Sequence, residues 1–383
     1  MSKTDSSRRI TFLYLSEPDV IAAGITDMAA CIDTMEDVFR LLGEGDYRLP
    51  GVNNNSHGSW VMFPKESKFP RMPLDGPDRR FMAMPAYIGG DYHATGVKWY
   101  GSNAENKKKG LPRSILTFIL NDADTGAPKA MMSANLLSAV RTGAVPGVGT
   151  RYFAKPDAKV LGVIGPGVMN RTCLAAFMSE RPGIETIKVF GRGKASIDRY
   201  CELIAKDYPS VKSVIVVDTI EEAVRDSDIV SVATSASGKA GSQHYPLLKR
   251  EWVKPGAFLS LASNVAIDDG FYTKDVLKIV DNIGQYEAWA EDHPSPTHEH
   301  VGIIGNHFMD LVERGVLVPD DIVDLGKVVM GEAQGRTNSD QIVLFSIGGL
   351  PVEDVAWAHR IYENALKLGI GTELLLWDEP ALA

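Results

Sequence analysis

The sequence has few cysteines and no long apolar segment. Its three cysteines, Cys31, Cys173 and Cys201, lie far apart and form neither a CxxC pair nor a zinc-binding pattern with histidine. We therefore expect reduced thiols in a reducing compartment. Apolar runs such as 159–165 are much shorter than the ~20 residues that span a bilayer. The polar start, MSKTDSSRRI, is not followed by a signal-peptide core. These absences predict a cytoplasmic protein without a membrane partner.

An excess of positive charge is also missing. The 40 lysines and arginines are outnumbered by 49 aspartates and glutamates, which gives a formal net charge of -9. Because nucleic-acid binding relies on a basic surface, this balance predicts no nucleic-acid partner. An anionic substrate would have to be bound by a few locally placed cations. The 383 residues correspond to two or three domains of roughly 150 residues, each able to bury a core without metal.

The first part of the chain mixes helical and extended patterns. Apolar residues recur at helical spacing over 17–43, and extended patterns follow at 81–88, 95–100 and 114–121. Helices on either side of such strands indicate an α+β unit.

From about Ala158 the chain alternates short apolar strands with helices. This alternation is typical of a doubly wound parallel sheet with right-handed crossovers. The expected strands are 159–164, 186–190, 213–217, 229–234, 257–262 and 279–281, and the expected helices are 168–179, 194–206, 219–226, 308–314, 320–330 and 352–368. Because the last helix is expected to return to the first domain, we predict an α/β domain at 146–309 inserted between 1–145 and 310–383.

A glycine turn follows the first of these strands. It reads Gly165-Pro166-Gly167-Val168-Met169-Asn170, so Asn170 stands where GxGxxG has its third glycine. Small residues in such a turn let backbone N–H groups approach a pyrophosphate at a helix N-terminus. GxG alone is weak evidence, but here it closes a strand and opens a helix, as a dinucleotide site requires.

The end of the second strand bears on the choice of cofactor. NAD-specific folds usually place an acid there for the ribose 2′-hydroxyl, whereas this chain has Arg192 and Lys194 and no acid. Two cations would favour the additional 2′-phosphate, so NADP is favoured over NAD. Arg192 stacking on adenine or facing solvent remains open.

Several separate motifs then resemble one family in the correct order. They are Met84-Pro85, GVKW at 96–99, LNDADTGAP at 120–128, LSAVRTGA at 137–144 and VLFSIGGLPVED at 343–354. With them the chain resembles the ornithine cyclodeaminase/mu-crystallin family, and KWYGSNAENKKKGLPRS is most similar to its opine-type amino-acid dehydrogenase branch.

The resemblance implies a homodimer of two-domain subunits. A Rossmann domain at 146–309 would bind NAD(P), and residues 1–145 with 310–383 would form the substrate-binding and dimerisation domain, with an amino or imino acid between the domains. A lysine and an arginine bind the substrate carboxylate in this family, and they match Lys98 and Arg141. Arg48 is a candidate third cation. Lys98 is also a candidate proton donor or acceptor at nitrogen if burial lowers its pKa.

The expected cofactor site combines the glycine turn with positions at other strand ends. For Ser346, which matches a family position near the nicotinamide, an ordinary turn role is equally open. The expected cofactor-binding residues are Thr142, Gly165, Gly167, Val168, Met169, Arg192, Lys194, Thr234, Ser235, Asn264 and Ser346.

One position departs from the cyclodeaminases. They carry an aspartate after the fifth Rossmann strand, and Asn264 stands there. An amide orients an amine but does not exchange a proton near neutral pH. We therefore predict Lys98, Arg141 and Asn264 as catalytic residues of hydride transfer, and we expect ornithine cyclisation to be disfavoured.

Three functions stay open. The first is an NAD(P)-dependent oxidoreductase acting on the C–N bond of a small amino or imino acid, with a 2-oxo acid and an amine as possible co-substrates. The second is an ornithine cyclodeaminase that forms proline and ammonia. The third is a non-catalytic NADPH-binding protein of the mu-crystallin type.

Two polar clusters receive weaker interpretations. His293, His298 and His300 are expected in a solvated interdomain loop without a metal, because the segment is rich in proline. Lys107 to Lys109 are expected to form a solvated turn.

Overall fold

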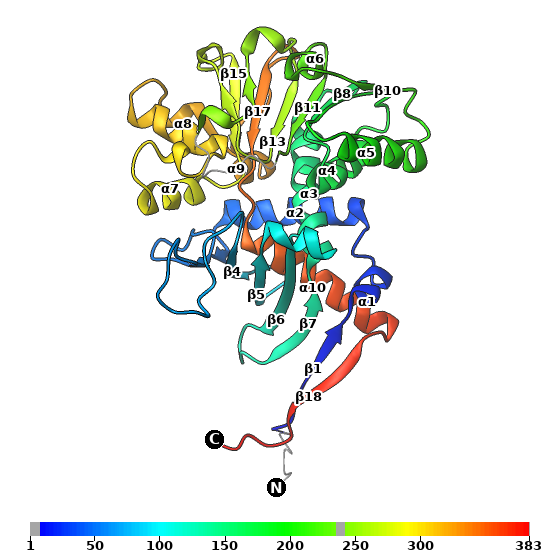
Figure 1. The fold of residues 1–383 in the computed structure, drawn as a ribbon, viewed down its shortest axis with the longest axis vertical. Coiled ribbons are helices and arrows are strands. Elements are labelled where there is room, and N and C mark those ends of the chain that lie inside the picture. The colour runs from blue at the N-terminus through cyan, green and yellow to red at the C-terminus, as the bar shows by residue number, and fades with distance from the viewer. Residues whose placement is uncertain (1–7, 235–241, 383) are drawn as a thin grey trace. The chain divides into compact units, whose positions relative to one another are not determined.

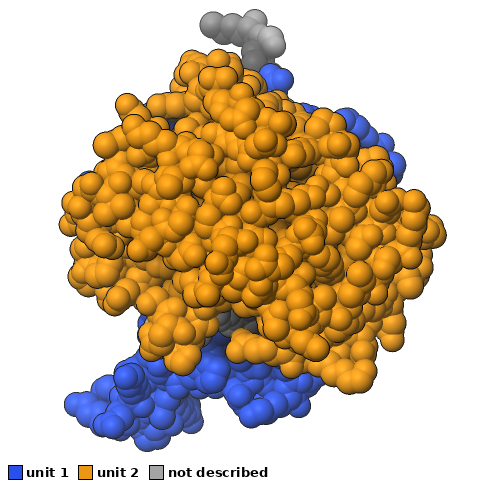
Figure 2. Space-filling view, turned by 90° about the horizontal axis from the view of Figure 1, so that it is seen from above, with its two compact units in different colours: residues 1–27, 46–138, 350–383 blue, residues 28–45, 139–349 orange. Residues whose placement is uncertain are grey.

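The computed structural model describes residues 8–234 and 242–382, and the chain forms two compact units (Figure 2). Unit 1 comprises Met1–Asp27, Asp46–Ser138 and Leu350–Ala383, and unit 2 comprises Met28–Gly45 and Ala139–Gly349. The divisions at 138/139 and 349/350 differ from the expected boundaries at 145/146 and 309/310, mainly because 310–349 belongs to unit 2.

Unit 1 contains a mixed sheet in the order β18-β1-β7-β6-β5-β4-β2, with β3 paired to β4. Neighbouring strands are antiparallel except for the parallel pair β1 and β7. Its strands are β1 (Ile10–Leu15), β2 (Tyr47–Arg48), β3 (Ser59–Met62), β4 (Arg80–Ile88), β5 (Ala94–Ser102), β6 (Ser114–Asp122), β7 (Pro128–Ser133) and β18 (Thr372–Trp377), and its helices are α1 (Glu17–Ala22) and α10 (Pro351–Leu368).

The central strands of this sheet alternate between a buried and an exposed face. Met84, Lys98 and Phe118 are aligned across β4, β5 and β6 and are buried. Helix α10 contacts these same strands (Figure 1). Because successive side chains point to opposite faces, Trp99 lies on the other face and is exposed.

Unit 2 contains a parallel sheet in the order β10-β9-β8-β11-β13-β17-β15-β16. Its strands are β8 (Val160–Ile164), β9 (Thr186–Phe190), β10 (Ser213–Val216), β11 (Ile229–Val232), β13 (Phe258–Leu261), β15 (Val276–Val280), β16 (Ile322–Asp324) and β17 (Ile342–Ser346); β12 (Leu247–Leu248) and β14 (Ala266–Ile267) pair separately. The central strands are buried except for Val160 at the start of β8, which is half-buried, as expected for a sheet covered on both faces. The predicted doubly wound α/β class is confirmed.

The helices of unit 2 surround this sheet. In Figure 1, α4 and α5 lie on the side of β8 to β10, and α7 and α8 lie on the side of β15. The helices are α2 (Met28–Glu44), α4 (Val168–Glu180), α5 (Lys194–Asp207), α6 (Ile220–Val224), α7 (Ile283–Asp292), α8 (Ile304–Glu313) and α9 (Leu325–Val329), and α3 (Asn135–Phe153) begins in unit 1 and continues into unit 2.

The predicted helix at 320–330 is wrong in its first half. Residues Pro319–Asp321 form a short 3₁₀ helix, Ile322–Asp324 form β16 beside β15, and only Leu325–Val329 are α-helical. Asp324 causes the change, because its carboxylate accepts the backbone N–H of Gly326 at 2.8 Å and caps the shorter helix.

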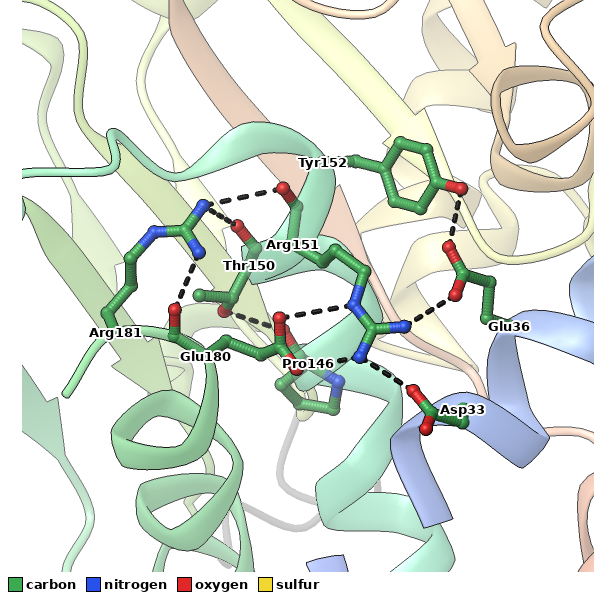
Figure 3. A network of polar contacts seen from close by, with 8 residues as sticks. All are labelled: Asp33, Glu36, Pro146, Thr150, Arg151, Tyr152, Glu180 and Arg181. Carbon is green, nitrogen blue, oxygen red and sulfur yellow. Dashed lines mark hydrogen bonds and ion pairs between the residues drawn. The ribbon is translucent and has the colours of Figure 1, made fainter. Parts of the chain in front are cut away.

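Arg151 connects three helices of unit 2 (Figure 3). From α3, its guanidinium donates to Asp33 and Glu36 of α2 at 2.8 and 2.5 Å and to Glu180 of α4 at 2.9 and 3.1 Å. These carboxylates raise the pKa of Arg151, with Glu180 as the largest cause. Because Glu180 is largely buried, this network is expected to stabilise the packing of the three helices.

Arg151→Ala is therefore expected to lower the free energy of unfolding by about 1–3 kcal/mol, after allowance for the partial exposure of the network. Urea denaturation at neutral pH measures this change. Arg40→Ala is the matched control, because Arg40 forms exposed ion pairs with Asp37 and Glu44 on α2. This variant should lower the free energy of unfolding by no more than about 0.5 kcal/mol. Equal losses in the two variants would contradict the assignment.

Candidate active site

The predicted cofactor residues of unit 2 gather at one edge of its sheet. All of its strands are parallel, so their carboxyl ends meet there. Gly165 follows β8, Thr234 lies just beyond β11, and Ser346 ends β17. The chain runs from β8 outward to β9 and β10 and then returns to β11 on the other side of β8. This reversal is the switch point where open α/β sheets bind ligands.

The glycine turn has the geometry that a pyrophosphate site needs. Gly165 has φ +90°, and a Cβ there would lie 2.7 Å from the Ala233 carbonyl oxygen, so a larger residue is excluded. Gly167 is the N-cap of α4, and among the described residues no atom lies within 4 Å of where a Cβ there would be. Val168 and Met169 beside this helix terminus are exposed. These features fit a dinucleotide.

The Asn170 side chain stabilises this turn through hydrogen bonds to its backbone. It is fully buried, and its side-chain amide donates to the carbonyl oxygens of Ile164 and Gly165 at 3.1 and 2.8 Å. Ser231 of β11 donates to Asn170 Oδ1 at 2.6 Å, and the Tyr200 hydroxyl of α5 donates to the Asn170 carbonyl at 3.1 Å. In the sequence, Asn170 is recognisable only as a departure from the GxGxxG pattern. In the structure, its hydrogen bonds connect α4 to β8, β11 and α5.

The two cations after β9 differ in their surroundings. Lys194 opens α5, and its Nζ donates to both carboxylate oxygens of Asp198 at 2.7 and 2.9 Å. This hydrogen bond raises the pKa of Lys194. Arg192 is exposed in the turn before α5. Lys194 is therefore already partnered on its own helix, and Arg192 is the better placed of the two for a ligand.

The strand ends beyond β11 carry the remaining predicted positions of this edge. Ser263 Oγ accepts the backbone N–H of Thr234 at 2.9 Å and joins the ends of β11 and β13. Asn264 follows directly and is half-buried. Thr142 is half-buried in α3, and Ser235 lies outside the described residues.

Arg141 is buried in unit 2 and lies against a glycine turn. Its side chain is 4% exposed, and a Cβ at Gly349 would lie 3.1 Å from Arg141 Nη1. Gly348 and Gly349 donate their backbone N–H groups to one oxygen of Asp281 at 2.7 and 2.9 Å. The sequence did not single out Asp281; an acid directly after a buried strand was the available signal.

Lys98 is buried in unit 1 in an ion pair. Its Nζ lies 2.8 Å from Asp354 Oδ2, with side-chain exposures of 2% and 0%, and it donates to Ser138 Oγ at 3.2 Å. Asp354 belongs to the VLFSIGGLPVED motif but was not predicted as a partner of Lys98. Arg48 differs, because it is exposed in β2 and donates to the Tyr47 carbonyl. The geometry therefore distinguishes a buried cation from a surface cation among the predicted carboxylate ligands.

The histidine segment does not form a solvated loop throughout. His298 is buried, and its Nε2 lies 3.0 Å from the Val265 carbonyl oxygen. Its burial lowers its pKa. The loop prediction is wrong for His298 because Asp310 accepts the N–H groups of Thr297 and His298 and draws the segment into the core. Within the described residues, no group of three or more His, Cys, Asp or Glu side chains is placed to bind a metal.

Comparisons with known proteins agree with this fold. The profile of the ornithine cyclodeaminase/mu-crystallin family matches residues 25–369, and the chain therefore belongs to that family. The resemblance read from the motifs is confirmed. One relative is N-((2S)-2-amino-2-carboxyethyl)-L-glutamate dehydrogenase of Staphylococcus aureus, 26% identical over 95% of this chain and 98% of that protein.

Two solved structures are similar over nearly the whole chain. Thermococcus litoralis Delta(1)-pyrroline-2-carboxylate reductase, in complex with NADH and L-proline, is 29% identical with a TM-score of 0.75 and covers 94% of this chain and 99% of its own. An archaeal alanine dehydrogenase dimer with bound NAD is 25% identical with a TM-score of 0.75 and covers 96% and 100%. In the part of the chain that the structure describes, no helix has the length and apolarity needed to cross a membrane.

Proposed function

We propose that the protein is an NAD(P)-dependent oxidoreductase that acts on the C–N bond of a small amino or imino acid. The observation that carries this proposal is that both cations predicted to bind the substrate carboxylate, Lys98 in unit 1 and Arg141 in unit 2, are buried in a chain of net charge -9. Burying a cation is costly, and buried cations are concentrated at functional sites. The relatives named above act on amino or imino acids, which supports the same class of substrate here.

Each of the two cations has a proposed role in binding the substrate. The Arg141 guanidinium binds the α-carboxylate, since a planar fork accepts both carboxylate oxygens. Lys98, oriented by Asp354 and Ser138, is the second proposed carboxylate ligand and would polarise the C–N bond.

The cofactor supplies or accepts the hydride when bound. The residues that would hold it are Gly165 and Gly167 at its pyrophosphate, Val168 and Met169 beside the turn, and Ser346 near the nicotinamide. Asn264 would orient the substrate amine without exchanging its proton, which favours hydride transfer over ornithine cyclisation.

NADP is proposed as the preferred cofactor because Arg192 is exposed next to the end of β9. Arg192→Ala is expected to raise KM for NADPH by about 10-fold, the loss of one charged hydrogen bond, and to leave KM for NADH unchanged. Steady-state kinetics with both cofactors measure this. Equal changes for NADH and NADPH, or a wild-type protein that prefers NADH, would contradict the assignment.

A homodimer formed through the sheet of unit 1 is part of the proposal. Val61, Phe81, Trp99 and Ile115 are exposed on one face of β3 to β6, and the Phe81 and Trp99 rings stack with centroids 5.6 Å apart. A contiguous apolar sheet face of this kind is typical of a protein interface. The alanine dehydrogenase noted above is a dimer, and this apolar face is the surface through which a dimer of this chain would form.

Trp99→Asp is accordingly expected to convert the dimer to a monomer, because it places a charge in the centre of the apolar face. Sedimentation velocity gives the mass directly. Ile215→Asp is the matched control, since Ile215 is an exposed strand residue of unit 2. A wild-type monomer, or a Trp99→Asp variant with unchanged mass, would exclude this interface.

A cytoplasmic location is also proposed, since the Cys173 and Cys201 thiols are free and a reducing compartment keeps them so.

The proposed activity is tested by following oxidation of NADH and NADPH with pyruvate plus ammonia, with pyruvate plus an amino acid, and with cyclic imino acids. We expect turnover with at least one of these substrates. Proline formation from ornithine without net cofactor change would instead identify a cyclodeaminase. Calorimetric binding of NADPH with every substrate inactive would identify a binding protein.

A further inference from the structure

Asp281, directly after β15, carries a fully buried carboxylate with a complete set of donors. Oδ2 accepts the N–H groups of Gly348 and Gly349 at 2.7 and 2.9 Å. Oδ1 accepts the Tyr286 hydroxyl at 2.8 Å and the Asn282 N–H at 3.1 Å. Four donors to one buried carboxylate are enough to hold it in its ionised form and to fix its orientation.

The first pair of these bonds fixes the turn that contacts Arg141. Gly349 has φ +76°, a conformation that favours glycine, and the space beside it is taken by Arg141 Nη1. Because Asp281 holds both N–H groups of the Gly348-Gly349 turn, it sets the position of the backbone against which the guanidinium rests.

The second pair extends to Ser346. The Tyr286 hydroxyl, which donates to Asp281, lies 2.9 Å from Ser346 Oγ, and Ser346 Oγ accepts the Gly305 N–H of α8 at 2.8 Å. With its hydroxyl bonded to Asp281, Tyr286 fixes where the Ser346 side chain points. One carboxylate thus connects the turn at Arg141 with the serine at the end of β17.

We propose that Asp281 is a positioning residue that sets the placement of Arg141 through the Gly348-Gly349 turn and of Ser346 through Tyr286. This inference rests on the proposed function, because it assigns Asp281 to the carboxylate-binding and nicotinamide-facing parts of the same site. Asp281 itself touches neither substrate nor cofactor in this account.

Protonation of Asp281 is expected to make kcat/KM depend on pH. Burial raises the pKa of Asp281 to about 6, and its four donors oppose the rise. The titratable and charged groups facing it are Tyr286 of α7, Arg141 of α3 behind the glycine turn, and Asp324, which accepts the Ile283 N–H at 2.9 Å. A protonated carboxyl accepts fewer hydrogen bonds, so the Gly348-Gly349 turn is held less firmly as the pH falls through about 6. The wild-type kcat/KM should therefore decline below about pH 6.

Asp281→Asn tests the inference. We expect KM for the carboxylate substrate to rise about 10-fold or more, the dissociation constant of NADH to stay within about twofold, and the decline of kcat/KM near pH 6 to disappear. Tyr286→Phe keeps the glycine-turn contacts and loses the link to Ser346, so it should lower kcat more than it raises KM. Asp324→Asn is the control, because it removes a half-buried carboxylate that accepts from Ile283 and Gly326 and not from the glycine turn; the decline of kcat/KM at low pH should persist in this variant.

Binding supplies a readout that does not need turnover. Calorimetric titration of the NADH-loaded protein with L-proline should show affinity weakened about 10-fold by Asp281→Asn and unchanged by Asp324→Asn. An Asp281→Asn variant with wild-type KM, proline affinity and pH profile would overturn the inference, as would equal effects of the two variants. A wild-type protein that neither binds proline nor turns over any substrate would overturn the proposed function, and this inference with it.

Discussion

Lys98→Met is expected to lower kcat/KM for the amino- or imino-acid substrate by about 10³-fold, because it removes a charged hydrogen-bond donor from a buried site where charge develops in the transition state. The affinity for NADH should remain within about twofold. Steady-state kinetics together with calorimetry separate the two quantities. A variant that retains most of its kcat/KM would exclude Lys98 from the reaction.

The same substitution is expected to destabilise unit 1, because Asp354 would remain buried without its ammonium partner. Breaking a buried ion pair from one side costs about 3–5 kcal/mol, which urea denaturation at neutral pH would show. Adding Asp354→Asn should recover most of this stability, since it removes the unpaired charge, and should leave activity low. Recovery of activity along with stability would mean that Lys98 acts only on folding.

Arg141→Ala should raise KM for the substrate by about 10²-fold or more, with a smaller effect on kcat, because it removes the bidentate partner of the α-carboxylate. Arg141→Lys should recover only part of the loss, since an ammonium does not form the planar pair. Substrate-saturation kinetics of both variants measure the difference.

Arg336→Lys provides the control for this prediction. Arg336 is a half-buried arginine that donates to the Phe153 and Gln341 carbonyls, away from the predicted carboxylate ligands. Its substitution should reduce stability while leaving KM unchanged. An Arg141→Ala variant with the KM of the wild type would remove Arg141 from the substrate site.

Short apolar runs and their spacing in the sequence predicted most of the strands in the parallel sheet of unit 2. The alternation after Ala158 predicted β8, β9, β11 and β13, because a buried parallel strand is a short apolar run whatever its partners are. β17 was missed although Ile342–Ser346 is as apolar as the others. It pairs with β13 and β15, but it lies beyond the regular alternation of strands and helices, and the expectation of a strand depends on that alternation.

The candidate site was predictable as a set of residue types but not as a set of partners. Glycine turns and isolated cations are visible in the sequence, and the family resemblance directed attention to Lys98 and Arg141. The partner of Lys98 lies 256 residues away in the chain, and Asp281 reaches Gly349 across 68 residues. Such pairings follow from the tertiary packing within each unit, which local sequence patterns do not specify.

The central claim is hydride transfer to the carbon of a C–N bond, and an isotope measurement tests it most directly. The protein would be incubated with cofactor in which both hydrogens at C4 of the reduced nicotinamide are replaced by deuterium, together with a cyclic imino acid or with pyruvate and an amine. We expect one deuterium on the α-carbon of the amino-acid product, found by mass spectrometry and NMR. A product that forms without the label, or cofactor that stays unoxidised with every substrate, would contradict it.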